Sequence, residues 1–367
     1  MAQINNLLPA GHDRESRVVL WVVGAALGHI SRSLIIARQL RSSFGINSHF
    51  FGPDLRGNIA SVIGNEFSRT YFNCKWWEVK KFADHFENLV KNVAPCLVCY
   101  DCSPTPWLVA APETVVPEVY ITNYFLTSIG DEGTVQDVQW ETHRAWWEHL
   151  RKLYRLPDIS SVRQFYEKDL VLLVDPPGFI PCGVELPDNY RIVGPCFWEP
   201  DIPLPEELEK FHNILFVSMG STAADSIPAH LIETIAGQLH PDAVIGVGKV
   251  ATEYKKIKNY PRLPNSKVLE RSVFALTHGG TGTVYQALAC GVPVACWPMH
   301  INHKILGRRV EKLGFGKYFD PDHDNNILKE RALDIAVLEA NIRRSAGEIR
   351  NNPESAAREI ANFIQRL

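Results

Sequence analysis

The sequence lacks several features that would place it in a specialised class of protein. No stretch holds the roughly 18 consecutive apolar residues that a helix needs to cross a bilayer. The segment before Val18 has no apolar run of the kind found in secretory signals. A net charge of −3 provides no electrostatic attraction for nucleic acid. We therefore expect a cytoplasmic protein with no transmembrane segment and no nucleic-acid partner.

Cysteine is present, but it follows no disulfide framework. The eight cysteines are scattered, which is typical of a reducing compartment. Cys96, Cys99 and Cys102 have a spacing that occurs in iron–sulfur proteins, but they fall in a segment with the apolar pattern of a buried strand. Because side chains alternate faces along a strand, we expect Cys96 and Cys102 on one face and Cys99 on the other. Three such thiols cannot converge on a metal.

The overall composition is that of a soluble globular protein. Of 367 residues, 46% are hydrophobic and 22% are charged. This length exceeds what one ordinary hydrophobic core serves, so two domains are expected.

The segment FALTHGGTGTVYQALACGVPVACWP, residues 274–298, predicts one βαβ unit of a parallel sheet. Residues 274–277 form a short apolar run, 283–290 have helical spacing, and 292–297 form a second apolar run. Glycines at such a turn let backbone N–H groups approach an anion, and the helix N-terminus adds partial positive charge. The glycine turn therefore favours a phosphate site, although a tight connection without a ligand would have the same glycines.

Similar apolar runs occur along the whole chain. Residues 18–23 and 46–51 flank the glycine turn and amphipathic helix GAALGHISRSLIIARQLRSSFG. Further buried strands are expected at 96–100, 119–121, 170–174, 214–218 and 244–247. The proline-rich and acidic segment CFWEPDIPLPEELEK interrupts this series near residues 197–212 and has the composition of a linker. The pattern predicts two doubly wound α/β domains, whose ligand-binding sheet edges face each other across a cleft.

Several motifs resemble the inverting UDP- or dTDP-sugar glycosyltransferases of the GT-B fold, a family that includes antibiotic and macrolide glycosyltransferases. The motifs are FVSMGS, LPN, THGGTGTVYQALACGVPVACWPMHINHKILGRRVEKLGFG, the opening GAALGHISRSLIIARQL and RIVGPCF. The resemblance implies two Rossmann-like domains, with residues 1–197 binding the acceptor and 213–350 binding the nucleotide-sugar. It also implies that a C-terminal helix in residues 351–367 packs back towards the N-terminal domain. The partners would be a nucleotide-sugar donor and a small-molecule or lipid-like acceptor.

The resemblance also assigns site residues by position. Leu263 would lie beside the base, Gln286 at the ribose, and Asn302 with His303 at the donor sugar. Gly28 belongs to the first glycine turn, and the residues expected around the diphosphate are Gly220, Ser221, His278, Gly280, Thr281, Gly282 and Thr283.

Two of these positions depart from the family pattern. Gln286 stands where a glutamate usually binds the ribose, and Asn302 with His303 stands where an Asp-Gln pair usually binds the sugar. We therefore expect a donor other than UDP-glucose, either a modified UDP-sugar or a dTDP-deoxysugar. Alternatively, Asn302 and His303 simply cap the next helix.

The chemistry of sugar transfer requires a base for the acceptor hydroxyl. His29 follows the first glycine turn, and an imidazole exchanges protons near neutral pH, so it is the candidate base. Asp101 ends a neighbouring strand on the same sheet edge, where a carboxylate could orient the imidazole and support its positive charge. It also falls where the resembled enzymes carry a supporting aspartate. For His29, capping of the following helix remains an alternative.

No metal or other cofactor is expected. The helix N-terminus, glycine backbone and His278 could stabilise the departing diphosphate, no acidic DxD pair accompanies the glycine turns, and His300 with His303 is a weak ligand spacing. The aromatic residues between Tyr71 and Trp147 could form an acceptor platform or ordinary core; they include Tyr71, Phe72, Trp76, Trp77, Phe82, Phe86, Trp107, Trp140, Trp146 and Trp147.

Three functions fit these features. The first is an inverting glycosyltransferase that acts on a small, natural-product-like acceptor, as in antibiotic biosynthesis. The second is a non-hydrolysing nucleotide-sugar epimerase, which shares the architecture but needs acidic catalytic residues. The third is a catalytically silent auxiliary protein, which the presence of both His29 and Asp101 disfavours.

Overall fold

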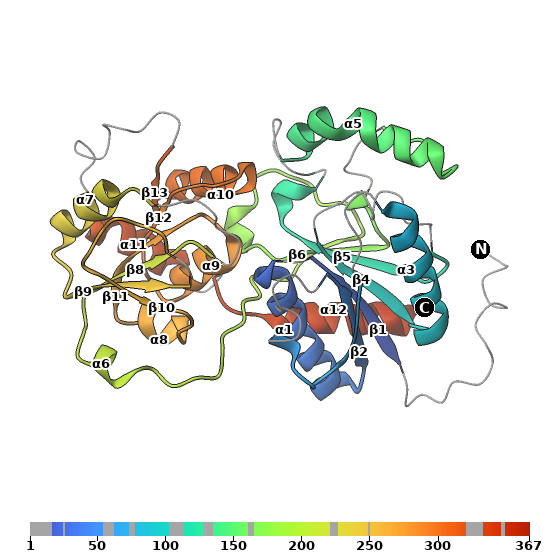
Figure 1. The fold of residues 1–367 in the computed structure, drawn as a ribbon, viewed down its shortest axis with the longest axis horizontal. Helices are drawn as coiled ribbons and strands as arrows, with labels where there is room; N and C mark the ends of the chain where they lie inside the picture. The colour runs from blue at the N-terminus through green and yellow to red at the C-terminus, as the bar shows by residue number, and fades with distance from the viewer. Residues whose placement is uncertain are drawn as a thin grey trace.

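The protein consists of two α/β lobes that lie side by side (Figure 1). The computed structural model describes residues 17–24, 26–53, 62–72, 78–102, 114–127, 129, 135–160, 165–220, 227–248, 250–320, 333–345 and 349–367, without the side chains of residues 79 and 135–142. No helix in these ranges has the length and apolar character needed to cross a membrane.

The N-terminal lobe is built on a seven-stranded sheet. Its strand order is β3-β2-β1-β4-β5-β6-β7, and every neighbouring pair is parallel. The strands are β1 (Val18–Val23), β2 (Asn47–Gly52), β3 (Ser68–Tyr71), β4 (Leu97–Asp101), β5 (Glu118–Thr122), β6 (Leu170–Leu173) and β7 (Tyr190–Ile192).

The C-terminal lobe has a six-stranded parallel sheet. Its order is β10-β9-β8-β11-β12-β13. The strands are β8 (Ile214–Ser218), β9 (Ala243–Val247), β10 (Ile257–Tyr260), β11 (Ser272–Thr277), β12 (Val294–Cys296) and β13 (Gly316–Tyr318).

Helices connect the strands and cover the sheets. They are α1 (Leu27–Phe44), α3 (Val79–Val93), α5 (Val135–Leu153), α6 (Glu206–Glu209), α7 (Ala229–Leu239), α8 (Asn265–Leu269), α9 (Thr281–Ala289), α10 (Ile301–Lys312), α11 (Ile335–Ser345) and α12 (Pro353–Arg366), with 3₁₀ turns η4 (Tyr124–Leu126) and η6 (Pro177–Phe179). Two doubly wound parallel sheets confirm the expected fold class. Within the glycine-turn unit, α9 begins at Thr281, two residues earlier than the spacing predicted.

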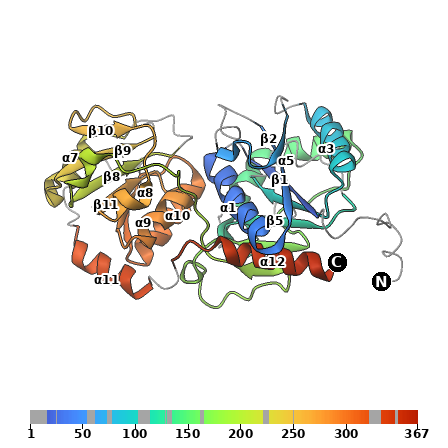
Figure 2. The same cartoon turned by 90° about the horizontal axis from the view of Figure 1, so that it is seen from below.

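The last helix returns to the first lobe. Helix α12 lies along α1 beneath the N-terminal sheet (Figure 2). Its apolar face joins the core formed by β1, β4 and α1, through Ala356, Ala357, Ile360, Ala361 and Ile364. The chain therefore crosses between the lobes twice, once after β7 and once before α12.

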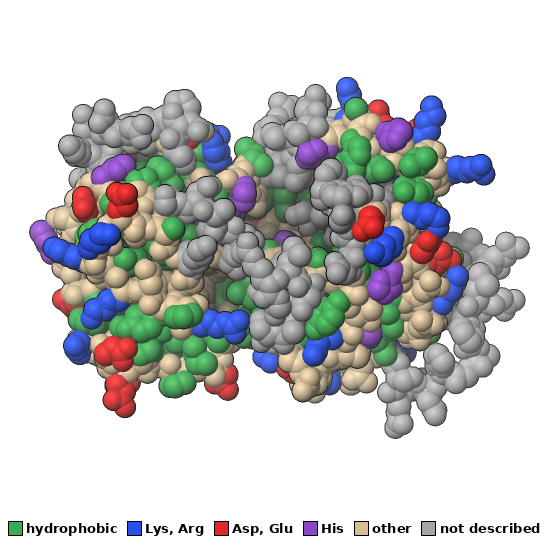
Figure 3. All heavy atoms as spheres, in the orientation of Figure 1, with side chains coloured by type: hydrophobic (Ala, Val, Ile, Leu, Met, Phe, Trp, Pro, Cys, Tyr) green, Lys and Arg blue, Asp and Glu red, His purple; other side chains and the backbone are tan. Residues whose placement is uncertain are grey.

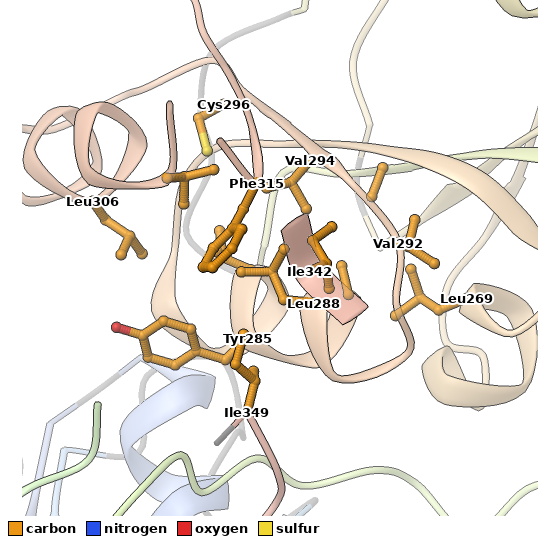
Figure 4. Packing of buried hydrophobic residues seen from close by; sticks show 14 of the residues in the cluster. Leu269, Tyr285, Leu288, Val292, Val294, Cys296, Leu306, Phe315, Ile342 and Ile349 are labelled. Carbon is orange, nitrogen blue, oxygen red and sulfur yellow. The ribbon is translucent and has the colours of Figure 1, made fainter. Parts of the chain in front are cut away.

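The lobes also touch through buried side chains. Phe179 of η6 packs edge-on against Tyr285 of α9, with ring centroids 5.1 Å apart. Arg309 of α10 donates hydrogen bonds to the backbone carbonyls of Gly178, Phe179 and Ile180. Figure 4 shows Tyr285 at the edge of the apolar cluster that fills this part of the C-terminal lobe. The space-filling view shows a furrow between the lobes (Figure 3).

One detail of the cysteine expectation was wrong. Cys96 precedes β4 and is not part of it, and it packs with Cys99 against the cluster that includes α1 and α12. Cys102 follows the strand and joins the cluster on the other side of the sheet. Strict alternation fails because the first of the three residues lies outside the strand.

Candidate active site

Helix α1 begins at Leu27, a short turn after β1 ends at Val23, and it carries three of the polar side chains of the site. Gly24 donates its backbone N–H to the Asp101 carbonyl, which ties the turn after β1 to the end of β4. A Cβ at Gly24 would come within 3.1 Å of the His29 ring, so a larger residue there would press on the imidazole. His29 lies in the first turn of α1, and 28% of its side chain is exposed.

Asp101 is fully buried, and its side-chain partners among the described residues all lie on α1. Its Oδ1 lies 2.7 Å from His29 Nδ1 and also accepts from Arg32 Nη2. Its Oδ2 accepts from Arg32 Nε at 2.8 Å and from Ser33 Oγ at 3.1 Å. The structure therefore brings the two expected catalytic residues together and adds Arg32 and Ser33, which sequence reasoning missed.

The charges in this cluster compensate each other. Burial acts to raise the pKa of Asp101, but the Arg32 guanidinium and the His29 bond outweigh it and hold the pKa below its usual value. Burial acts to lower the pKa of Arg32, but the Asp101 carboxylate outweighs it and raises the pKa. Asp101 is thus an anion that can only accept hydrogen bonds, so His29 Nδ1 donates in this contact and Nε2 is the ring nitrogen that Asp101 does not bind.

A second buried carboxyl links this cluster to the other lobe. Asp175, just after β6, accepts from Asn123 Nδ2 at 2.8 Å and from the backbone N–H of Tyr124 at 2.7 Å. It also accepts from the hydroxyl of Tyr285 on α9 at 2.5 Å. Arg32 is close enough to influence the pKa of both Asp175 and Tyr285. The His29–Asp101 pair and the glycine-turn helix therefore lie beside two polar clusters that interact electrostatically through Arg32.

The glycine turn after β11 packs against the loop after β8. The His278 imidazole lies against Gly220 and Gly280. A Cβ added at Gly220 would come within 2.6 Å of the ring, and one added at Gly280 would come within 2.4 Å. Thr281, Gly282 and Thr283 form the first turn of α9. The N-terminal amides of α9 thus project from a strand end, a suitable place for an anion. Ser221 lies outside the described residues.

The imidazole of His278 is neutral in this environment. Burial lowers its pKa to about 4, with a further contribution from His300, while a hydrogen bond with the Ser218 backbone opposes the change. Its Nδ1 is buried and has no hydrogen-bond partner in the described part of the chain. His278 can therefore serve a ligand as a neutral donor or acceptor, but not as a cation.

His303 lies beneath His278 in the glycine turn. The two rings meet edge to face with centroids 4.6 Å apart, and His303 Nδ1 accepts from the Met299 backbone N–H at 3.4 Å. Burial, reinforced by the neighbouring histidines, lowers the pKa of His303 to about 2. His303 therefore bonds the backbone just before α10, while the N-cap residue of that helix, His300, has no side-chain capping bond in the described structure. Asn302, in the same first turn, is partly exposed.

The position expected for the ribose is buried and polar. Gln286 accepts from Asn265 Nδ2 through its Oε1 at 3.3 Å. Gln286 Nε2 and Asn265 Oδ1 are buried and have no partner among the described residues. Leu263, expected beside the base, is packed into the core two residues before Asn265. Asn265 is a further site candidate that sequence reasoning missed.

Four of the six described aromatic residues considered for an acceptor platform are core. Phe72, Phe82 and Phe86 are buried around Phe51, and Trp147 is buried against Phe165. Tyr71 is exposed and Trp146 is partly buried. Trp76 and Trp77 with Trp107 lie outside the described residues, as does the side chain of Trp140. Within the described ranges, no three His, Cys, Asp or Glu side chains are grouped to hold a metal ion.

The two buried histidines predict acid sensitivity. Their pKa values of about 4 and about 2 lie below the roughly 6.5 of an unfolded histidine, so the unfolded state binds more protons between these values. Their contribution is complete above about pH 6.5 and is lost as the pH falls. Each histidine should lower the free energy of unfolding at pH 5 by about 2 kcal/mol relative to its value at pH 7.

The measurement is urea unfolding at pH 7 and pH 5, with His303→Gln as the comparison. The variant can still accept the Met299 N–H bond through its amide oxygen but has no titrating ring, so it should lose about 2 kcal/mol less than the wild type on acidification. Equal losses in the two proteins would contradict the assignment of a buried neutral imidazole at 303.

Comparison with known proteins relates the chain to glycosyltransferases over its whole length. No protein-family model matches it. A PGL/p-HBAD biosynthesis glycosyltransferase of Mycobacterium tuberculosis is 24% identical over 99% of this chain and 94% of the relative. The NDP-glycosyltransferase YjiC of Bacillus licheniformis is 23% identical over 78% of this chain and 77% of the relative.

Solved structures share the same fold. The calicheamicin glycosyltransferase CalG4 matches with a TM-score of 0.68 and 19% identity, covering 96% of this chain and 99% of CalG4. The glycosyltransferase VinC, solved with dTDP, matches with a TM-score of 0.64 and 14% identity over 95% of this chain and all of VinC (100%). The paired parallel sheets and the likeness to curated enzymes from end to end identify the chain as a glycosyltransferase with the GT-B fold of the antibiotic glycosyltransferases.

Proposed function

We propose that the protein is an inverting enzyme that moves a sugar from a UDP- or dTDP-sugar to a hydroxyl of a small, natural-product-like acceptor. The observation that carries this proposal is the 2.7 Å contact between His29 Nδ1 and Asp101 Oδ1 at the carboxyl edge of the N-terminal sheet. It leaves His29 Nε2 as the nitrogen that can take a proton. Relatives named for PGL/p-HBAD biosynthesis and for calicheamicin support this acceptor class.

In the proposed reaction, His29 Nε2 removes the proton of the acceptor hydroxyl as that oxygen attacks the anomeric carbon of the donor. The bond between the anomeric carbon and the diphosphate oxygen breaks, and its electron pair leaves with the diphosphate. Attack from the face opposite the leaving group inverts the anomeric configuration. Asp101 holds the Nδ1 proton and stabilises the imidazolium that forms.

The C-terminal lobe would hold the donor. The α9 N-terminus, with Gly280, Thr281 and Thr283, would receive the diphosphate, and neutral His278 would add a hydrogen bond. Gln286 Nε2 and Asn265 Oδ1 offer one donor and one acceptor for the nucleoside hydroxyls.

Because the α9 N-terminus and His278 would stabilise the leaving diphosphate, we expect transfer to continue in excess chelator. Loss of activity that Mg²⁺ or Mn²⁺ restores would contradict this part of the proposal.

The donor preference is tested by competition. Nucleotide-sugars are first screened for thermal stabilisation, since a ligand that binds only the folded state raises its stability. Initial rates are then compared for UDP-glucose, UDP-N-acetylglucosamine and a dTDP-deoxysugar, with a library of phenols and alcohols as acceptors. We expect UDP-glucose to have a lower kcat/KM than one of the other two, because Asn302 replaces the carboxylate typical of the family.

The matched variant is Asn302→Asp, which restores that carboxylate. A hydrogen bond to a buried sugar hydroxyl is worth about 1–3 kcal/mol. The variant should therefore raise kcat/KM for UDP-glucose, relative to that for the preferred donor, by roughly 5-fold to 150-fold. A highest kcat/KM for UDP-glucose in the wild type would refute the donor inference. Conversion of the donor to an epimer without acceptor, or no turnover with any donor that binds, would refute sugar transfer itself.

A further inference from the structure

Arg32 makes the strongest contacts to the carboxylate that the proposed mechanism uses. It lies one helical turn after His29 on α1, so both side chains point to the same side of the helix. Its Nε is 2.8 Å from Asp101 Oδ2, and its Nη2 bonds Oδ1, the oxygen that His29 also contacts. Only 7% of Arg32 is exposed, and Asp101 is fully buried. Arg32 and Asp101 therefore form a buried bidentate ion pair beside the imidazole of the proposed base.

A buried ion pair at this position has a consequence for the proton on His29. A carboxylate without a counter-charge strongly stabilises a positive imidazole beside it. His29 would then already hold its proton in the resting enzyme and could not accept one from an acceptor hydroxyl. Arg32 offsets part of the charge of Asp101, while Oδ1 still accepts the hydrogen bond from His29 Nδ1–H.

We propose that Arg32 is a positioning residue for sugar transfer: it fixes the Asp101 carboxylate and balances its charge so that His29 rests as a neutral base. The proposal rests on the proposed function, in which His29 is the base. Arg32 acts only through Asp101 and touches neither donor nor acceptor. Ser33 Oγ completes the coordination of Oδ2 without adding charge.

The neighbouring groups leave Arg32 as the counter-charge of Asp101. Asp175 is the second carboxyl close to Arg32, but its oxygens are bonded to Asn123, Tyr124 and Tyr285. Among the described residues, the other titratable groups that interact electrostatically with Asp101 or Arg32 are thiols and phenols whose pKa values burial raises, so they are uncharged at neutral pH; they are Cys99, Cys102, Tyr120, Cys196 and Tyr285.

The test is the NMR titration of the His29 ring in ¹⁵N-histidine-labelled full-length protein, which requires no acceptor. The His29 signals are identified by their loss in His29→Ala. In Arg32→Gln the pH at which this ring titrates should rise by about one unit or more relative to the wild type, because an unbalanced carboxylate favours the protonated ring by that amount. A purely structural role for Arg32 would not shift this titration.

Ser33→Ala is the matched control, since it removes a bond to the same carboxylate without changing the charge. Its His29 titration should follow the wild type. If Arg32→Gln does not fold, Arg32→Ala is purified with guanidinium at a sub-denaturing concentration, and withdrawal of the guanidinium should raise the titration midpoint.

Two results separate this inference from the function on which it rests. A folded Arg32→Gln protein whose His29 titrates as in the wild type would overturn the role of Arg32, even if His29→Ala is inactive. A shift of the titration in Arg32→Gln together with a fully active His29→Ala would uphold the charge balance but refute His29 as the base.

Discussion

Replacing His29 by alanine is expected to lower kcat by a factor of about 10² to 10⁴, the usual contribution of a general base. The reason is that no other group in the described structure shares its arrangement, with one ring nitrogen held by a buried carboxylate and the other left for a substrate. Donor affinity should stay unchanged, because the proposed donor contacts lie on the C-terminal lobe. The measurements are steady-state kinetics with the best donor and acceptor from the screen, and donor binding by calorimetry.

His49→Ala is the control for this variant. His49 is a half-buried histidine of the same sheet, bonded to Ser68 and Thr70 at the edge strand β3, away from the dyad. Its replacement perturbs packing to a similar degree but should leave kcat near the wild-type value. Unchanged turnover in a folded His29→Ala protein would refute His29 as the base but would leave the GT-B fold unaffected.

The sequence predicts the central strands well because they are buried on both faces. Such strands form continuous apolar runs, as in Ile214–Ser218, and a glycine turn with a following helix marks where a ligand can approach. The edge strands were missed. Ser68–Tyr71 and Ile257–Tyr260 are short and half exposed, so they carry no apolar run that could be recognised.

The polar network was only partly foreseeable. Asp101 was found by the rule that residues after parallel strands share one sheet edge, and the same rule applies to Asp175 after β6. The position of Arg32 could also be predicted from the sequence, because a residue three positions after His29 in a helix lies on the same helix face as His29. The motifs did not indicate Asp175 or Arg32, because sugar transfer does not by itself require a charge that neutralises the catalytic carboxylate.

Other features depend on the arrangement of the lobes. The bond from Tyr285 to Asp175 joins residues 110 positions apart in different lobes, and nothing local to either residue encodes it. His303 shows the opposite limit. Its position in the motif predicts a sugar contact, which stays a prediction, and the sequence did not indicate that its ring packs against His278 and accepts a bond from the Met299 backbone.

Asp101→Asn is expected to have two large effects with different causes. Activity should fall by two to four orders of magnitude, since an amide cannot stabilise the imidazolium and can hold the wrong tautomer; the equivalent change in the serine-protease triad costs about 10⁴-fold. Stability should also fall by about 3–5 kcal/mol, because the buried Arg32 guanidinium loses its counter-charge. The measurements are kcat with the screened substrates and the midpoint of urea unfolding.

The double variant Arg32→Met/Asp101→Asn separates these two effects. Removing both charges replaces a buried ion pair with groups that need no counter-charge, so most of the lost stability should return. Activity should not return, because His29 still lacks a carboxylate. A double variant that is stable but inactive assigns the catalytic loss to Asp101 itself. If the single variant is folded and fully active while His29→Ala is dead, another group must orient the base, and the buried pair would then serve only to join α1 to β4.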